Sequence, residues 1–249
     1  MKISIITPTF NSSKTINDTL ASIQSQSYKN IEHIIIDGMS IDDTLEICRR
    51  ESPSSIIISE PDNGIYDAMN KGINIASGDI IAILNSDDFY DNQFVIERVV
   101  ESFNSNNSLD FIYGNLIYIS SKDKNIKVRE WVSESYYKNF FEDSKVPPHP
   151  TLFLKKEIYK KVGLFNLQYK LASDYDFMFR LFKLYNFNSL HINSNLVMMR
   201  LGGATSKNIR NIYKQNIEIY NCWINHGFNF PLSFFTKKVF NRISQFIRI

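Results

Sequence analysis

Short apolar runs alternate with stretches of helical periodicity along the first part of the chain. The helical stretches cover about residues 16–27, 40–48 and 64–78, where apolar residues recur every three or four positions. The apolar runs are typical of strands buried on both faces of a parallel sheet; they are ISIIT (3–7), IEHIIID (31–37), SIIIS (55–59) and DIIAIL (79–84). This order predicts an α/β fold with a Rossmann-like, mostly parallel central sheet and helices on both faces.

The second half of the chain is less regular. LDFIYGNLIYI (109–119) predicts a longer strand with a bend at Gly114, VPPHP (146–150) an extended loop, and DYDFMFRLFKLYNF (174–187) a helix. We expect residues 1–109 and 110–205 to form the two halves of one domain built on the same sheet. Residues 206–249 are expected to form a C-terminal helical, basic and aromatic segment.

The composition indicates a globular enzyme. Of 249 residues, 43% are hydrophobic and 22% are charged, and no apolar stretch is long enough for a transmembrane helix. The N-terminal apolar run is short and is broken by Pro8, which argues against a signal peptide. Cys48 and Cys222 belong to no metal-binding spacing, so reduced thiols in a cytoplasmic protein are expected.

The charge is distributed unevenly, although the formal net charge is only +2. No acidic residue follows Glu218, while four cationic residues do, so the body carries a slight negative charge and is not expected to bind nucleic acid. In the tail, several apolar residues fall largely on one helical face: Phe234, Val239, Phe240, Ile243 and Ile247. This pattern suits a helix lying on an anionic membrane surface, and docking on the body is the alternative.

Two adjacent carboxylates, Asp87 and Asp88, directly follow the apolar run 79–84. In an open α/β sheet, ligands bind at the carboxyl ends of the strands. A divalent cation such as Mg²⁺ or Mn²⁺ would neutralise the pair and stabilise a leaving phosphate, whereas a solvated turn is the plain alternative. The chain has no glycine-rich dinucleotide or P-loop motif, so a nucleotide would need other contacts.

Five segments, in this order, resemble family 2 glycosyltransferases of the GT-A fold. They are the stretch from ITPTFN to DGMSIDDT, then SEPDNGIYDAMNKGI, GDIIAILNSDD, HPTLF and SDYDFMFRL. The likeness covers about Ile3 to Gly203 and is nearest to bacterial enzymes of colanic-acid, O-antigen and capsule assembly. It implies an inverting enzyme that uses a UDP-sugar donor, with residues 1–109 as the nucleotide-sugar half and residues 110–205 as the acceptor half of a GT-A domain.

The resemblance implies a set of donor contacts. The threonine of the first-strand motif, Thr7, would contact the nucleotide, and the aspartate that ends the second strand, Asp37, would help to hold uracil. Many relatives carry a second aspartate where this chain has Gly38. Further residues would face the ribose, the diphosphate or the leaving UDP: Asp62, Tyr66, Asp67, Lys71 and Arg200.

The resemblance also implies metal and acceptor residues. Where relatives often have the motif D-x-D, this chain has Asn85 and Ser86 followed by Asp87 and Asp88. Asn85 and Ser86 would then contact the ribose, and either aspartate would bind Mn²⁺ or Mg²⁺.

In the later acidic motif, Asp174 would be the catalytic base and Asp176 would lie near the acceptor, as would His149. A helix N-cap is the alternative for Asp174.

The resemblance implies an inverting transferase that moves a hexose from a UDP-sugar to a polyprenyl-diphosphate-linked glycan. The reaction would serve the assembly of a bacterial surface polysaccharide such as O-antigen, lipopolysaccharide or capsule, at the cytoplasmic face of the inner membrane. Two alternatives remain at this stage. One is a sugar-1-phosphate nucleotidyltransferase, and the other is an inactive subunit that binds a sugar nucleotide or a glycan.

Overall fold

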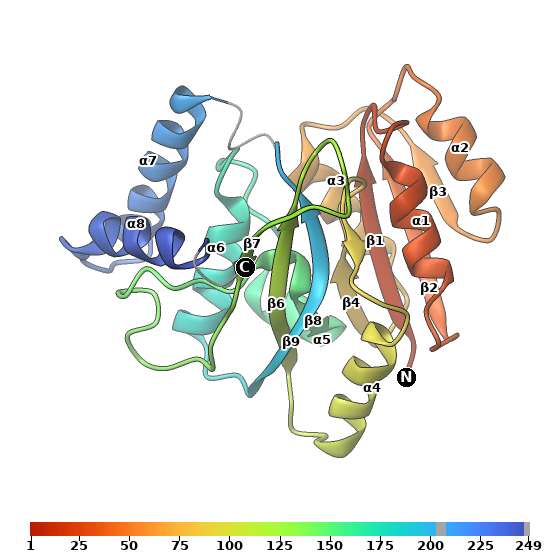
Figure 1. The fold of residues 1–249 in the computed structure, drawn as a ribbon. Coiled ribbons are helices and arrows are strands. Elements are labelled where there is room, and N and C mark those ends of the chain that lie inside the picture. Colours follow the sequence, from red (N-terminus) through yellow and green to blue (C-terminus); the bar gives the residue numbers. More distant parts are fainter. Residues whose placement is uncertain (203–207, 247–249) are drawn as a thin grey trace.

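The computed structural model describes residues 1–202 and 208–246, which fold around one central sheet (Figure 1). The first four strands of the sheet are parallel and lie in the order β3-β2-β1-β4. They are β1 (Ile3–Thr9), β2 (Ile31–Asp37), β3 (Ile56–Ser59) and β4 (Ile80–Ile83). Their residues are apolar on both faces because helices cover both sides of the sheet.

The second part of the sheet is mixed and continues as β8-β6-β9-β5, with β7 paired to β6. Strand β8 runs antiparallel to both β4 and β6, and β9 is parallel to β6. The prediction of a mostly parallel sheet therefore describes the first four strands best. The strands of this part are β5 (Phe89–Tyr90), β6 (Phe111–Ile119), β7 (Lys127–Trp131), β8 (Phe153–Lys155) and β9 (Ser189–Arg200).

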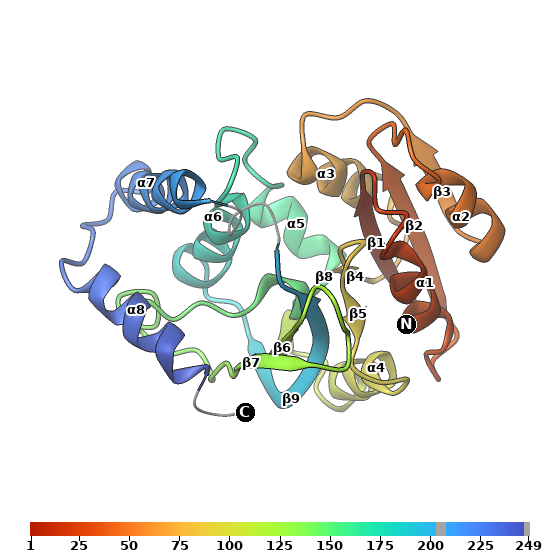
Figure 2. The ribbon, with the colours of Figure 1, turned by 45° about the horizontal axis from the view of Figure 1, so that its top comes forward.

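Helices pack on both faces of the sheet, as the sequence predicts (Figures 1 and 2). One face carries α1 (Ile16–Gln24), α2 (Thr44–Glu51) and α4 (Val95–Ser105). The other carries α3 (Ile65–Ile75), α5 (Lys156–Val162) and α6 (Ser173–Phe179). A short 3-10 turn, η1 (His149–Thr151), precedes β8, and a π-helical turn, η2 (Arg180–Leu184), continues α6.

Two C-terminal helices, α7 (Ile209–Asn225) and α8 (Phe234–Ser244), pack beside α6 rather than on the sheet (Figure 2). Helix α8 is docked through the buried ring of Phe234 and through Lys237, whose ammonium lies 2.7 Å from Asp143. The spacing in the sequence places Phe234 on an apolar face that points outward, but its ring is buried against the body of the protein. Ile247, which the sequence assigns to the same face, lies outside the described residues. Within those residues, no helix has both the length and the apolar character needed to cross a bilayer.

Candidate active site

One edge of the sheet gathers most of the predicted site residues. The parallel strands β1, β2 and β4 end there, and so do β6 and β9, because the antiparallel strand β8 lies between β4 and β6. The turn η1 with His149 leads into β8 at the same edge, and Arg200 ends β9 there. Loops at this edge are the ordinary place for a ligand in an α/β sheet.

A pocket of about 440 Å³ opens at this edge between the loop after β1 and the turn after β4. It is lined by residues of polar or charged type, which are Asn11, Ser12, Ser13, Lys14, Thr15, Asp42, Ser86 and Asp87. The hydroxyl of Ser86 lies 2.8 Å from that of Ser12, and its carbonyl accepts a 3.0 Å hydrogen bond from Thr15. These bonds tie the turn after β4 to the start of α1 and fix Asp87 beside the pocket.

The two adjacent carboxylates lie in different surroundings. Asp88 is fully buried and accepts hydrogen bonds from Asn85 Nδ2 at 3.0 Å and from the backbone nitrogen of Arg200 at 3.3 Å. Asp87 lines the pocket. Burial raises the pKa of both carboxyls, and the charge of Asp87 raises that of Asp88 further.

A divalent cation fits this donor set. Asn85 Oδ1 is buried and has no hydrogen-bond partner in the described part of the chain. An orphaned carbonyl oxygen beside one buried and one partly exposed carboxylate offers the oxygen ligands that Mn²⁺ and Mg²⁺ prefer, and such an ion would offset the repulsion between the two charges. Of the two carboxylates, Asp87 is the one open to the pocket.

Arg200 is held beside this edge by α1. Its guanidinium pairs with Asp18, which also binds the ammonium of Lys124 at 2.5 Å. Burial opposes ionisation of Asp18, but the hydrogen bonds from Lys124 and Arg200 outweigh it and lower the pKa of this carboxyl. Arg200 Nη1 is buried without a partner among residues 1–202 and 208–246. No sequence signal marks Asp18 or Lys124, because the pairing joins α1 to two distant segments.

Thr7 and Asp37 lie inside the sheet rather than on the pocket. Thr7 Oγ1 is 3.0 Å from His33 Nε2 on the neighbouring strand. Asp37 is fully buried and accepts hydrogen bonds from Ser40 Oγ at 2.5 Å and Ser59 Oγ at 2.6 Å. Thr9, the last residue of β1, has a buried hydroxyl without a partner among the described residues. Sequence reasoning missed Thr9, although it follows Thr7 by two positions and therefore lies on the same face of the strand.

Hydrogen bonds within the loop between β3 and α3 stabilise its conformation. Asp62 Oδ1 accepts the backbone N–H of Gly64 at 2.8 Å, and Asp67 accepts that of Asn63 at 2.9 Å. Lys71 pairs with Glu60 at 2.8 Å. Asp62 also occupies the space beside Gly38, where an added Cβ would lie 2.4 Å from Asp62 Oδ2. The departure from the family pattern at residue 38 thus makes room for the carboxylate of Asp62.

Asp174 lies in a cluster with Tyr66 and His149. The Tyr66 hydroxyl donates a 3.0 Å hydrogen bond to Asp174 Oδ1. Burial raises the pKa of Tyr66, and the charge of Asp174 adds to this effect. Burial lowers the pKa of His149, although the negative charge of Asp174 acts in the other direction and raises it. The N-cap of α6 is Ala172, so the alternative role of Asp174 as a cap is excluded.

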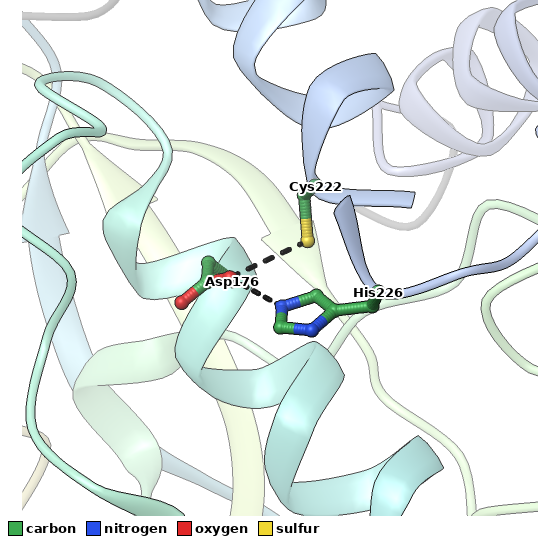
Figure 3. A group of neighbouring side chains, drawn as sticks. All are labelled: Asp176, Cys222 and His226. Atoms are coloured by element: carbon green, nitrogen blue, oxygen red, sulfur yellow. Dashed lines mark hydrogen bonds and ion pairs between the residues drawn. The ribbon is translucent and has the colours of Figure 1, made fainter. Parts of the chain in front are cut away.

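Asp176 faces the interior and joins α6 to α7 (Figure 3). Its carboxylate is 1% exposed, and His226 Nε2 and Cys222 Sγ lie 2.8 and 3.7 Å from Oδ1. Arg180 Nε donates to Oδ2 at 2.9 Å. Burial, together with the charge of Asp176, raises the pKa of Cys222, so the thiol is a hydrogen-bond donor. Oδ1 of Asp176 thus contacts α7, and Oδ2 contacts Arg180 in the turn that continues α6. The carboxylate is buried among these partners, and the acceptor-side role expected for it stays a prediction.

Comparisons with known proteins agree with this geometry. The family model described as glycosyl transferase family 2 matches residues 4–189. The chain is 33% identical over 181 residues to an uncharacterised glycosyltransferase of Mycobacterium tuberculosis, covering 72% of this chain and 68% of that protein. It is 29% identical over 183 residues to a PGL/p-HBAD biosynthesis glycosyltransferase of Mycobacterium bovis, covering 72% and 69%.

Solved structures confirm the predicted GT-A fold. S. aureus TarS in complex with UDP-GlcNAc superimposes with a TM-score of 0.70 at 18% identity, covering 98% of this chain and 73% of that chain. A mannosyltransferase from Pyrobaculum calidifontis, in complex with GDP-Man and Mn²⁺, gives a TM-score of 0.66 at 14% identity, covering 98% and 70%. At these identities the likeness concerns the fold.

Proposed function

Because this chain belongs to glycosyl transferase family 2, we propose that it transfers a hexose from a UDP-sugar to a glycan hydroxyl with inversion at the anomeric carbon. The observation that carries this proposal is the cluster of Asp174, Tyr66 and His149 at the edge of the sheet that also carries Asp87. It supplies a carboxylate for the acceptor on one side and a polar pocket for the donor on the other.

Asp174 is the general base of the proposed reaction. A sugar hydroxyl is a weak acid, and a carboxylate within hydrogen-bond distance accepts its proton as the oxygen attacks; such help is worth about 10²- to 10⁴-fold. The acceptor oxygen forms a bond to the anomeric carbon while the bond from that carbon to the UDP oxygen breaks. The Tyr66 hydroxyl keeps Asp174 Oδ1 in place and leaves Oδ2 for the acceptor. His149 is assigned to the acceptor side.

Asp87, with Asn85 Oδ1 behind it, would hold Mn²⁺ or Mg²⁺, and Asp88 orients Asn85. When bound, the cation offsets charge on the departing diphosphate. Arg200 is a cation of the chain itself at this edge, and its Nη1, which has no partner within residues 1–202 and 208–246, supports a contact with the same phosphate oxygens. The Mn²⁺ named with the Pyrobaculum structure supports a metal requirement.

The remaining donor contacts are proposed along the same edge. Ser86 lines the pocket, and Thr9, with its unpartnered hydroxyl, joins the residues assigned to the nucleotide. Asp62, Asp67 and Lys71 keep the role that the family pattern assigns, toward the ribose and diphosphate. Thr7 and Asp37, assigned to the nucleotide by that pattern, are proposed instead to shape the site from within the sheet. The complex of TarS with UDP-GlcNAc supports UDP as the nucleotide.

The acceptor is proposed to be a polyprenyl-diphosphate-linked glycan of surface polysaccharide assembly, at the cytoplasmic face of the inner membrane. Large apolar side chains are exposed on α8 and directly before and after it, although the other side of the helix is docked. Arg242 is exposed as well, while Lys237 and Lys238 pair with neighbouring residues. Such a surface favours an anionic bilayer; its apolar members are Leu232, Phe235, Val239, Phe240, Ile243 and Phe246.

The deciding experiment is a donor screen by UDP release, with a synthetic GlcNAc-diphosphate-lipid as acceptor, with and without Mn²⁺. We expect release with one UDP-hexose only when acceptor and metal are both present. D174N should keep UDP affinity and lose turnover by about 10²- to 10⁴-fold. Formation of pyrophosphate from UTP and a sugar phosphate would instead indicate a nucleotidyltransferase. Binding of UDP without turnover of any donor would indicate a binding subunit.

A further inference from the structure

Glu218 on α7 binds the backbone of the turn that leads into α6. Its Oε1 accepts the N–H of Lys170 at 3.0 Å, and its Oε2 accepts those of Leu171 and Ala172, both at 2.8 Å. The last of these residues is the N-cap of α6, two positions before Asp174. One carboxylate from a distant helix therefore fixes three consecutive backbone groups directly before the proposed base.

The start of α6 needs this support. The first N–H groups of a helix have no partner within the helix, and a side chain at the N-cap usually accepts one of them. Ala172 has no side chain that can do so, and no side-chain cap bond is formed there. A carboxylate at this end also interacts favourably with the helix dipole, and its hydrogen bonds are charge-assisted. Glu218 does not replace that cap bond, because its partners are the N–H of the N-cap residue and those of the two residues before it. It instead fixes from α7 the turn in which α6 begins.

Further contacts hold α7 against α6 just beyond Asp174. Trp223 Nε1 donates a 2.8 Å hydrogen bond to the hydroxyl of Tyr175, and His226 contacts Asp176. The two helices lie side by side in both ribbon views (Figures 1 and 2). Helix α7 therefore binds α6 on both sides of Asp174 along the chain, although it lies outside the family-matched residues 4–189.

We propose that Glu218 is a positioning residue for Asp174, and that α7 is part of the catalytic unit. The proposal rests on the proposed function, since it concerns the base of that reaction. The carboxylate holds the turn before α6 so that Asp174 stays within hydrogen-bond distance of both Tyr66 and the acceptor hydroxyl. A displacement of about 1 Å at a catalytic group can cost about 10²-fold in rate.

The test compares E218Q, E218A and the control N221A, which changes an exposed residue of the same helix. We expect kcat to fall about 10-fold in E218Q, which keeps one accepting oxygen, and about 100-fold in E218A. The KM for the donor and the affinity for UDP should stay unchanged in both, because the donor pocket is formed by other segments. N221A should behave as the parent protein.

A double-mutant cycle separates positioning from mere stability. If Glu218 acts through Asp174, adding E218Q to D174N should lower the remaining turnover by less than 2-fold, since the base is already absent. Full activity of folded E218Q and E218A, equal losses in kcat and donor affinity, or additive losses in the double variant would overturn the proposal. Full activity of D174N would instead overturn the proposed function, so the two failures are distinguishable.

Discussion

The hydroxyl of Tyr66 donates a 3.0 Å hydrogen bond to Asp174, and this bond joins α3 to the first turn of α6. The two residues are far apart in the chain, and each belongs to a different half of the proposed enzyme. The ring of Tyr66 also stacks on Phe165, with ring centroids 5.7 Å apart, and His149 packs edge-on against the same phenylalanine. The bond therefore couples the donor half to the base.

The first prediction concerns this bond. Y66F keeps the stacked ring and removes only the hydroxyl, so Asp174 loses one fixed oxygen. We expect kcat to fall about 10-fold and the free energy of unfolding to fall by about 1.5 to 3 kcal/mol, the usual net contribution of a hydrogen bond to a charged group. The matched control is Y137F, which removes a 2.8 Å bond from a tyrosine to Asp143 away from the site. Equal effects of the two variants on kcat would contradict a catalytic role for the bond.

The second prediction separates the two adjacent carboxylates. D87N removes the carboxylate that lines the pocket, and we expect it to abolish Mn²⁺-dependent turnover. D88N alters the residue that orients Asn85, and we expect it to lower Mn²⁺ affinity about 10- to 100-fold, as changes behind a metal ligand do. D91N, at an exposed carboxylate nearby, is the control. Metal titrations of turnover provide the measurement, and an unaltered metal requirement in D87N would refute the assignment.

The third prediction concerns pH and His33. Burial lowers the pKa of this histidine from 6.5 to about 4. Between these values the unfolded chain binds a proton that the folded chain does not, so the free energy of unfolding should decrease as the pH falls from 6.5 to 4. The loss over the whole window amounts to about 3 kcal/mol.

Urea unfolding of the parent protein and of H33Q at several pH values checks the contribution of His33. Glutamine can still bond with Thr7 and Ser55, the present partners of the imidazole, but it does not titrate. The difference between the two proteins should therefore change with pH in this window. A difference that is constant with pH would show that His33 is not responsible.

The fourth prediction concerns the exposed face of α8. Val239 and Phe240 are 58% and 72% exposed, so replacing both with serine should leave the docked side of the helix intact. We expect binding to vesicles rich in anionic lipid, measured by co-sedimentation, to weaken at least 10-fold, because burial of each large apolar side chain contributes about 1.5 to 3 kcal/mol. I126S removes an isoleucine that is 53% exposed in the turn between β6 and β7 and serves as the control. Equal binding of all three proteins would reject this surface as the membrane contact.

Much of the first half of the fold could be predicted from the sequence. The run at 31–37 matches β2, and the run that ends at Leu84 contains β4, because unbroken apolar runs between helical patterns leave few alternatives. In the second half, β5 has only two residues and β8 only three, and the helix expected over 174–187 is divided into α6 and a π-helical turn. Such short strands form because they pair with strands distant in the chain, and this pairing cannot be predicted from the local sequence pattern.

The sequence by itself determined the α/β order of elements and the location of Asp87 and Asp174 in motifs of a glycosyltransferase family, since local periodicity and local motifs are properties of neighbouring residues. Only the tertiary structure decided that Asp88 and Asp176 turn inward while Asp87 lines the pocket. It also decided that Asp18 binds Arg200 and that Glu218 supports the turn before Asp174. The physical reason is that burial and hydrogen-bond partners depend on packing between segments distant in the chain, and the same carboxylate can ligate a metal, pair with arginine or cap a helix according to its neighbours.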